Sequence, residues 1–397
     1  MLFNEDLADA LNNHDLRRMA RQRLPKWLFD FVDRGTEDEV ALRNNRAAFE
    51  RMKLKTQVLV DVSKRQQKVT IFGKQHDMPM GIAPTGAAGM LCYQGELALA
   101  RAAKAANIPF TLATGSQTSM EDVARLVGGT LWFQLYMWAD VSLSHQLVQR
   151  AKNAGFEALV VTVDGPVNTN REYNIRNGFT VPFRPNRRNT WDVVVRPGWL
   201  LGVLGRYMVT TGMPKRVNLP EGMKERVTHV SAAERKTKND GLSWKDLQVL
   251  RDMWPGKLIV KGILTPQDAE RAIAHGADGV VVSNHGGRNF DSSMAPIEAL
   301  PAVVDAVGSK TTVIVDSSFR RGSDVVKALC LGADMVMVGR PTLWGVTVGG
   351  EAGAAKSLRF FREEISRTIA YLGCTGIDQL HRDFLERVPT PHQAWEM

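Results

Sequence analysis

Eight short apolar segments, each followed by a stretch of helical periodicity, constrain the fold of this chain most strongly. Their sequences are MGIAP (80–84), PFTLAT (109–114), LWFQLY (131–136), ALVVTVD (158–164), KLIVKG (257–262), GVVVSNH (279–285), TVIVDS (312–317) and MVMVGR (335–340). Strands that are apolar on both faces and alternate with helices are typical of a buried parallel sheet. Eight such units predict a closed (β/α)8 TIM barrel. An open doubly wound sheet is the alternative, but no G-x-G-x-x-G motif follows the first strand.

The rest of the chain is expected to surround this barrel within a single domain of residues 1–397. Residues 5–50 show helical spacing and predict a helical cap, and the chain between the fourth and fifth strands is unusually long. The predicted parts are an N-terminal helical segment (1–78), the barrel (79–178 and 241–350), an insertion (179–240), and a C-terminal helix and tail (351–397).

The insertion at 179–240 carries most of the positive charge of the chain. It holds 12 Lys+Arg and 5 Asp+Glu, a net +7 of the whole chain's +9. Within it, RPGWLLGVLGRYMV is apolar and aromatic with arginines at its edges. This composition favours a helix lying on an anionic membrane surface, and a lid over the active site is the alternative. No nucleic-acid recognition motif accompanies the charge, so a nucleic-acid partner is not expected.

The cysteines and the N-terminal residues indicate in which cellular compartment the protein resides. Cys92, Cys330 and Cys374 lie far apart, which argues against a disulfide framework or a zinc site, and no metal site is expected. The first residues, MLFNEDLADALNNHD, are acidic and do not resemble a signal peptide. We therefore expect a cytoplasmic protein, held peripherally on the inner face of the cell membrane through the insertion.

Polar side chains follow the predicted strands at their carboxyl ends, where barrels carry their catalytic residues. The clearest group is SNHGGR, in which His285 and Arg288 stand three residues apart on a glycine-rich loop. A guanidinium can hold a carboxylate with two parallel hydrogen bonds, and an imidazole beside it can accept a proton. Tyr136, Asp164 and Lys261 follow other strands, and such a convergent set predicts an active site.

The last two strands predict a phosphate site. DSSFRRGSD and GRP place Arg320, Arg321 and Arg340 beside small residues after the seventh and eighth strands. This region of a barrel commonly binds phosphate, because small residues let backbone N–H groups approach and arginine supplies the counter-charge.

In these motifs the chain resembles the FMN-dependent 2-hydroxy acid oxidase and dehydrogenase family. This family includes glycolate oxidase, L-lactate dehydrogenase and mandelate dehydrogenase, and the motifs are most similar to those of mandelate dehydrogenase. The matching motifs are LPKWLFDF, IAPTGAAGM, WFQLY, TVDGPVNTNRE, IVKGIL, SNHGGR and DSSFRRGSD. The resemblance implies FMN as cofactor and oxidation of an L-2-hydroxy acid, mandelate-like or lactate-like, to the 2-oxo acid. It further implies electron transfer to a membrane quinone or similar acceptor, and a homotetramer.

The resemblance also implies a role for each matching residue. His285 would be the base, Asp164 would orient it, and Tyr136 would bind near the substrate hydroxyl. Arg171 and Arg288 would hold the substrate carboxylate, and Lys261 would stabilise the reduced flavin. The remaining cofactor contacts implied are Ala83, Pro84, Thr85, Gln134, Thr162 and Ser283 at the flavin ring, Asp316 at the ribityl chain, and Ser318, Arg320, Gly339 and Arg340 at the phosphate.

The chain departs from the family pattern at the substrate. Phe31 stands where the family presents a tyrosine to the carboxylate, so that hydrogen bond is missing. Either small acids should turn over less well, or the substrate carries a ring that packs on Phe31. Ala113-Thr114-Gly115 stands where oxidases often carry an indole, and Gly86 replaces an alanine. The site is therefore expected to be roomier, which favours aryl or longer substrates, and Gly86 favours a dehydrogenase over an oxidase.

Three other functions remain open from the sequence. The first is an oxygen-using 2-hydroxy acid oxidase, and the second is a non-catalytic flavin-binding barrel, which Phe31 makes conceivable. The third is a nucleotide dehydrogenase or isomerase that shares only the phosphate loops, but such enzymes do not need His285 beside Arg288.

Overall fold

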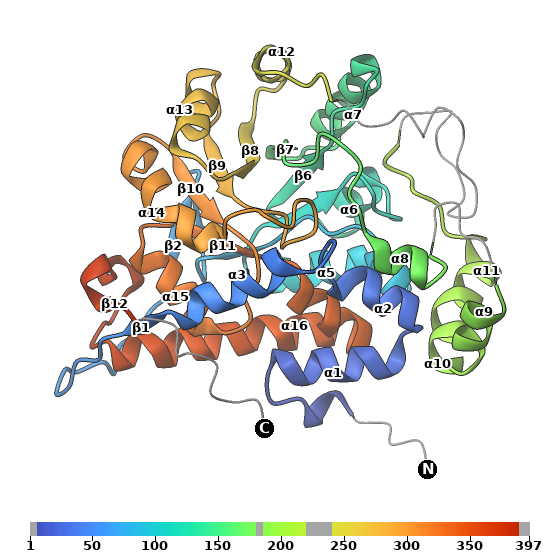
Figure 1. The fold of residues 1–397 in the computed structure, drawn as a ribbon, viewed down its shortest axis with the longest axis horizontal. Helices are drawn as coiled ribbons and strands as arrows, with labels where there is room; N and C mark the ends of the chain where they lie inside the picture. Colours follow the sequence, from blue (N-terminus) through green and yellow to red (C-terminus); the bar gives the residue numbers. More distant parts are fainter. Residues whose placement is uncertain (1–5, 180–185, 220–239, 389–397) are drawn as a thin grey trace.

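The computed structural model describes residues 6–179, 186–219 and 240–388, and it confirms the predicted barrel (Figure 1). Eight strands form a closed ring in the order β10-β11-β4-β5-β6-β7-β8-β9, and every neighbouring pair is parallel. Each strand overlaps one predicted apolar segment. The strands are β4 (Met80–Ile82), β5 (Phe110–Ala113), β6 (Leu131–Leu135), β7 (Ala158–Thr162), β8 (Lys257–Ile263), β9 (Gly279–Val282), β10 (Thr312–Val315) and β11 (Met335–Val338).

Helices follow the strands and cover the outside of the ring (Figure 1). Polar residues cap their first turns: the Ser119 and Thr265 side chains accept hydrogen bonds from the backbone N–H groups of Asp122 and Asp268. The covering helices are α4 (Ala88–Leu91), α5 (Gly95–Ala105), α6 (Met120–Leu126), α7 (Val141–Asn153), α12 (Trp244–Met253), α13 (Pro266–Ala274), α14 (Pro296–Val307), α15 (Gly322–Cys330) and the kinked α16 (Arg340–Tyr371).

The inside of the barrel is filled by side chains, and a hairpin closes its amino-terminal end. Strands β2 (Val69–Ile71) and β3 (Lys74–His76) pair antiparallel, and the Phe72 ring at their turn lies 5.8 Å from that of Trp132. Ile71 joins the same buried cluster as Ile259 and Met337. The segment 1–78 is therefore not helical throughout, because the barrel needs an apolar plug at this end and residues 69–76 supply it.

Three N-terminal helices bring distant parts of the chain to the carboxyl-terminal rim. They are α1 (Asn13–Arg23), α2 (Lys26–Asp33) and α3 (Val40–Glu50). Asn45 of α3 exchanges two side-chain hydrogen bonds with Asn284, at 2.9 and 2.8 Å, and so fixes α3 to the loop after β9. The carboxyl end of α2 points to the same loop.

The insertion folds into short helices beside α2 (Figure 1). The Trp199 indole donates to the Met90 carbonyl at 2.8 Å, and the Gln94 N–H donates to the Tyr207 hydroxyl at 3.1 Å. Of the predicted 179–240 segment, residues 180–185 and 220–239 lie outside the described residues. The helices are α8 (Glu172–Arg176), just before the insertion, then α9 (Arg187–Val194), α10 (Pro197–Trp199), the π-helical η2 (Leu200–Gly205) and α11 (Arg206–Thr210).

The described chain ends beside its first strand. A two-stranded antiparallel sheet joins β1 to β12, outside the barrel. Among the described residues, no helix combines the length and the apolar character needed to cross a bilayer. The remaining elements are η1 (Leu7–Asp9), β1 (Met52–Leu54), η4 (Ile377–Gln379), η5 (Arg382–Phe384) and β12 (Leu385–Arg387).

Candidate active site

A cavity of about 260 Å³ opens among the carboxyl ends of the barrel strands, and it gathers most of the predicted site residues. Three predicted residues do not line it but lie one hydrogen bond behind it: Asp164 bonds His285, Thr162 bonds Gln134, and Ser283 bonds Lys261. The predicted residues that line the cavity are Phe31, Ala83, Pro84, Thr85, Gln134, Tyr136, Arg171, Lys261, His285, Arg288, Asp316, Ser318, Arg320, Gly339 and Arg340.

His285 is held between a carboxylate and a phenol. Its Nδ1 lies 2.9 Å from Oδ1 and 3.2 Å from Oδ2 of Asp164, and its Nε2 lies 3.3 Å from the Tyr136 hydroxyl. Burial lowers the pKa of His285, although Asp164 opposes this shift. The imidazole is therefore neutral at neutral pH and can accept a proton at Nε2, while Asp164 stabilises the charged form.

The backbone after β9 adopts an uncommon conformation that aims this imidazole into the cavity. The φ angles of His285, Gly286 and Gly287 are 59°, 67° and 69°, all in the left-handed region. Glycine occupies this region freely, but histidine rarely does, and such strain concentrates at functional sites. The glycines after His285 therefore serve the geometry of the base.

Two neighbours position Asp164, and sequence reasoning missed both. The Asn289 amide donates to the backbone carbonyl and to Oδ1 of Asp164, at 2.9 and 3.1 Å. A Cβ added at Gly262 would lie 2.5 Å from the Asp164 Cβ, so no side chain fits there. Burial raises the pKa of Asp164, but His285 and Lys261 outweigh it and hold that pKa below its ordinary value. The carboxylate therefore stays ionised.

Lys261 lies on β8, between the strands that precede Asp164 and His285, and is buried. Its ammonium bonds the Ser283 hydroxyl at 2.7 Å and lies 3.0 Å from Asp316 Oδ2. Burial lowers the pKa of Lys261, but Asp316 and Asp164 outweigh burial and raise it. The cavity thus contains a fixed positive charge, which can stabilise negative charge developing nearby.

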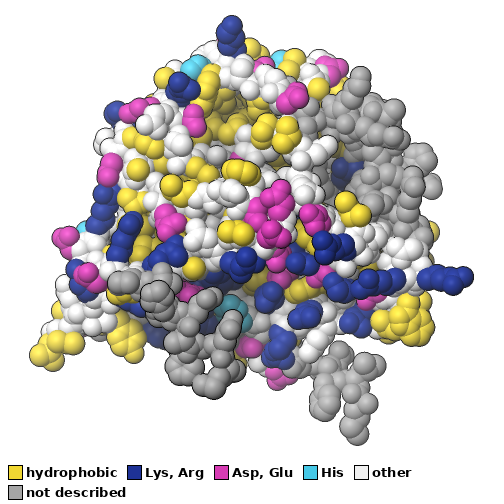
Figure 2. All heavy atoms as spheres, viewed as in Figure 1, with side chains coloured by type: hydrophobic (Ala, Val, Ile, Leu, Met, Phe, Trp, Pro, Cys, Tyr) yellow, Lys and Arg dark blue, Asp and Glu magenta, His cyan; other side chains and the backbone are white. Residues whose placement is uncertain are grey.

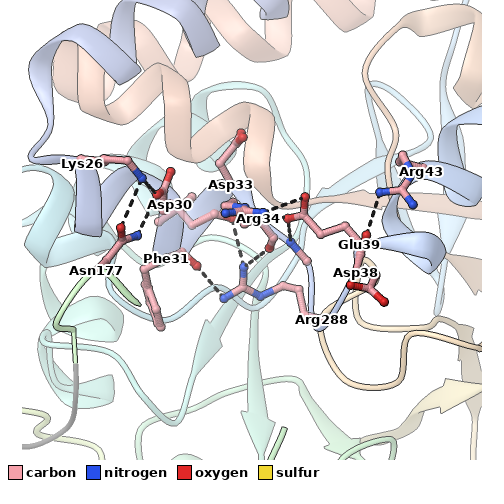
Figure 3. A network of polar contacts seen from close by, with 12 residues as sticks. Lys26, Asp30, Phe31, Asp33, Arg34, Asp38, Glu39, Arg43, Asn177 and Arg288 are labelled. Atoms are coloured by element: carbon pink, nitrogen blue, oxygen red, sulfur yellow. Dashed lines mark hydrogen bonds and ion pairs between the residues drawn. The ribbon is translucent and has the colours of Figure 1, made fainter. Parts of the chain in front are cut away.

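Arg171 and Arg288 form a first pair of neighbouring cations. Burial, and then the charge of Arg288, lower the pKa of Arg171 to about 10, so it stays protonated at neutral pH. The Arg288 guanidinium donates to the carbonyls of Phe31, Val32 and Arg34 at the end of α2, as Figure 3 shows for Phe31 and Arg34. Two cations at one cavity, beside His285, suit a carboxylate ligand.

Arg320 and Arg340 form a second pair of cations that line the same cavity. Burial and the proximity of Arg340 lower the pKa of Arg320 to about 9, and burial and Arg288 lower that of Arg340 to about 10. Arg321, the third arginine of the predicted phosphate site, instead pairs with Glu364 at 3.3 Å and does not line the cavity. Burying like charges is costly unless an anion accompanies them, so this pair suits a phosphate.

Orphaned hydroxyls support the fit of FMN to this cavity. Within the described part of the chain, the buried Oγ1 of Thr85 and the buried Oγ of Ser318 have no hydrogen-bond partner. Ser317 and Ser318 both have positive φ, 85° and 64°, so the loop after β10 departs from extended backbone beside these hydroxyls. A ligand with a polar chain and a phosphate would satisfy such groups. The residues present therefore fit FMN: Arg320 and Arg340 would hold its phosphate, and Lys261 would lie beside its ring.

Comparison with known proteins agrees with this geometry. A family model described as FMN-dependent dehydrogenase matches residues 20–387. The chain is 41% identical to the (S)-mandelate dehydrogenase of Pseudomonas putida, over 95% of this chain and 94% of that protein. It is 37% identical to an L-lactate dehydrogenase of Ectopseudomonas mendocina (strain ymp), over 94% of this chain and 97% of that protein.

A solved structure shares the whole architecture. The crystal structure of the monotopic membrane protein (S)-mandelate dehydrogenase superposes with a TM-score of 0.90 at 40% identity, and the match covers 96% of this chain and 100% of the other. The match includes the barrel that carries the predicted site. The chain therefore belongs to the FMN-dependent dehydrogenase family and is an FMN-dependent 2-hydroxy acid dehydrogenase or oxidase of that family.

Proposed function

We propose that this enzyme oxidises an L-2-hydroxy acid, mandelate-like or lactate-like, to the 2-oxo acid. The observation that carries the proposal is the position of His285, with Asp164 behind it and Arg171 and Arg288 beside it at one cavity. Oxidising such an acid removes two electrons and two protons from the substrate; His285 can take one proton, and FMN would accept the two electrons with the other proton.

Each neighbouring residue has a role in this proposal. Arg171 and Arg288 hold the substrate carboxylate, while the Tyr136 hydroxyl bonds near the substrate hydroxyl. Burial raises the pKa of Tyr136 to about 12, so the phenol stays protonated and can donate. His285 Nε2 takes the proton, and the ion pair with Asp164 stabilises the imidazolium that results.

We infer that a membrane quinone or similar acceptor takes the electrons, and that the insertion docks the enzyme on the inner face of the cell membrane. In the described part of the insertion, the largely exposed apolar side chains include Trp191 (68%), Leu201 (71%), Met208 (54%) and Val209 (84%). Hydrophobic and basic side chains gather over α9, α10 and α11 at the lower right of Figure 2. This combination suits an anionic lipid surface.

We also propose a homotetramer, as in the family that the sequence resembles. One exposed apolar corner supports a contact between copies, since Val58 and Leu59 are 79% and 104% exposed and Tyr371 is 65% exposed. Their segments are adjacent, because the Gln57 N–H bonds the Tyr371 carbonyl at 3.0 Å. Light scattering of the purified protein measures the oligomeric state.

Anaerobic reduction tests the enzymatic proposal. The purified protein should be yellow and should bleach when (S)-mandelate or L-lactate is added without an acceptor. Oxygen, a dye and a quinone are then compared as acceptors, and rapid reoxidation by oxygen would identify an oxidase instead. A coloured protein that no 2-hydroxy acid bleaches would instead indicate a flavin-binding barrel without this activity.

A further inference from the structure

A second, larger cavity adjoins the candidate active site. It has a volume of about 1160 Å³ and lies between strands β7 and β8 and helix α12, beside the start of α13. Figure 2 shows it as a hollow in the upper part of the molecule, with hydrophobic side chains around it. Its lining is largely apolar and includes Trp138, Leu219, Trp244 and Leu247, although Arg216 and Asp268 also border it.

The two cavities meet at four residues. Phe31, Gly115, Tyr136 and Arg171 line both of them. Tyr136 and Arg171 are the residues proposed to hold the substrate hydroxyl and carboxylate, so a substrate held by them lies at this junction. FMN would occupy the first cavity, and the second cavity is therefore the open space for the substrate side chain.

Gly115 makes the passage between the cavities. A Cβ added at this position would meet nothing within 4 Å, and the backbone there is not in the left-handed region. Gly86 faces it, since a Cβ added at Gly86 would lie 3.7 Å from the Gly115 carbonyl oxygen. Two side-chain-free positions thus leave a gap beside the substrate site, and the apolar cavity lies beyond it.

From this junction we infer that the second cavity binds the side chain of the substrate, and that the enzyme prefers 2-hydroxy acids with extended apolar side chains. The inference rests on the proposed oxidation of a 2-hydroxy acid. Each methylene that enters an apolar cavity is worth roughly a fourfold gain in binding. Affinity should therefore rise along the series L-lactate, L-2-hydroxyhexanoate and L-2-hydroxyoctanoate.

Stopped-flow reduction of the holoenzyme without any acceptor tests the inference, because it separates the substrate step from the acceptor step. The readout is the ratio of kred/Kd for L-2-hydroxyoctanoate to that for L-lactate. Leu247→Trp fills the second cavity from α12, and Gly115→Leu closes the passage. Each variant should lower the ratio at least tenfold, whereas Gly202→Leu, at an exposed glycine of the insertion that is equally free of contacts, should keep the wild-type ratio.

Binding of 2-oxooctanoate and pyruvate, followed by perturbation of the flavin spectrum, gives a second readout that does not depend on turnover. The inference is overturned if kred/Kd does not rise with the length of the substrate side chain. It is also overturned if both variants leave the octanoate-to-lactate ratio of kred/Kd unchanged. An unchanged ratio together with slower reoxidation by a quinone in Leu247→Trp would assign the cavity to the acceptor and also overturn it. If no 2-hydroxy acid reduces the flavin, the proposed function fails, and 2-oxo acid binding still decides the role of the cavity.

Discussion

The guanidinium of Arg288 holds Phe31 in place through the backbone and through the ring. Its Nη2 donates to the Phe31 carbonyl at 2.7 Å, and its central carbon lies 5.4 Å from the centre of the Phe31 ring (Figure 3). Arg340 donates to the carbonyls of Val32 and Arg34, which Arg288 also contacts. Two arginines thus satisfy the last carbonyls of α2, where a helix has unpaired acceptors and favours cations.

This anchoring places an aromatic ring where the family pattern has a tyrosine. Phe31 packs at 5.0 Å against Phe179, which stacks at 5.1 Å on Trp27 of the same helix. The ring is therefore held on one side by aromatic contacts and on the other by Arg288. A hydroxyl added to it would lie on a fixed ring at the wall of both cavities.

Phe31→Tyr should improve the turnover of small acids. A hydrogen bond to a charged group contributes about 1.5–3 kcal/mol, so kcat/KM for L-lactate should rise about tenfold or more. Steady-state kinetics with a dye acceptor measure the change. Phe290→Tyr, at an exposed phenylalanine that lines neither cavity, is the matched control and should have no effect. No gain on any 2-hydroxy acid would show that the family tyrosine is not what this site lacks.

Asp164→Asn should lower activity and change the pH below which activity is lost. His285 must be neutral to accept a proton, and burial lowers its pKa below the ordinary value of about 6.5. Activity should therefore fall only as the pH drops below that value. Asp164 raises the pKa of His285, so removing its charge shifts the limit to still lower pH.

The same substitution removes the charge that stabilises the imidazolium, and kcat should fall by roughly 10²–10⁴. The pH dependence of kcat/KM, compared with that of Glu172→Gln on the surface, checks both effects. If kcat/KM of the variant falls at the same pH as that of the wild type, the group that titrates is not His285.

Arg320→Gln should weaken FMN binding without unfolding the apoprotein. Arg320 is fully buried, and its neighbour Arg340 lowers its pKa further than burial alone does. Asp33 and Asp324 offset only part of this charge, so its removal costs the apoprotein little, whereas the holoenzyme loses a counter-charge. We expect the Kd for FMN to rise at least tenfold.

Quenching of FMN fluorescence on binding measures this Kd, and thermal unfolding of the apoprotein checks its stability. Arg321→Gln is the matched control, because Arg321 is the adjacent residue and pairs with Glu364 outside the cavity. Equal losses in the two variants would contradict the assignment of Arg320 to the phosphate.

The double variant Leu201→Glu with Val209→Glu should lose membrane binding. Both side chains are largely exposed on the insertion, and burying a side chain of this kind in an apolar phase is worth about 1.5–3 kcal/mol. The partition coefficient on vesicles that contain phosphatidylglycerol should fall at least tenfold in a flotation assay. Activity with a soluble dye should be retained.

Leu126→Glu, on α6 and 46% exposed, is the control for the added charge and should float like the wild type. If the double variant still floats with the vesicles, the insertion is not the membrane contact, and its basic character serves another purpose.

The sequence by itself determined the barrel and the ends of its strands. Runs such as Leu131–Leu135 are apolar on both faces, and only a sheet covered on both sides buries them, so eight such runs with helices between them have one simple solution. Local rules also placed His285, Lys261 and Asp164 on the functional rim, because the carboxyl ends of parallel strands share one edge. The resemblance of the motifs to a known family supplied FMN and the class of reaction.

Only the tertiary structure decided what lies next to these side chains. The contacts of Asn289 with Asp164, of Arg288 with Phe31 and of Arg321 with Glu364 join segments far apart in the chain, and periodicity carries no information on them. The hairpin at 69–76 could not be predicted from the sequence for the same reason, since a short hairpin is stable only against the barrel that it closes. The gap at Gly115 and the cavity beyond it are empty space, whose shape follows from how whole helices pack and not from any single residue.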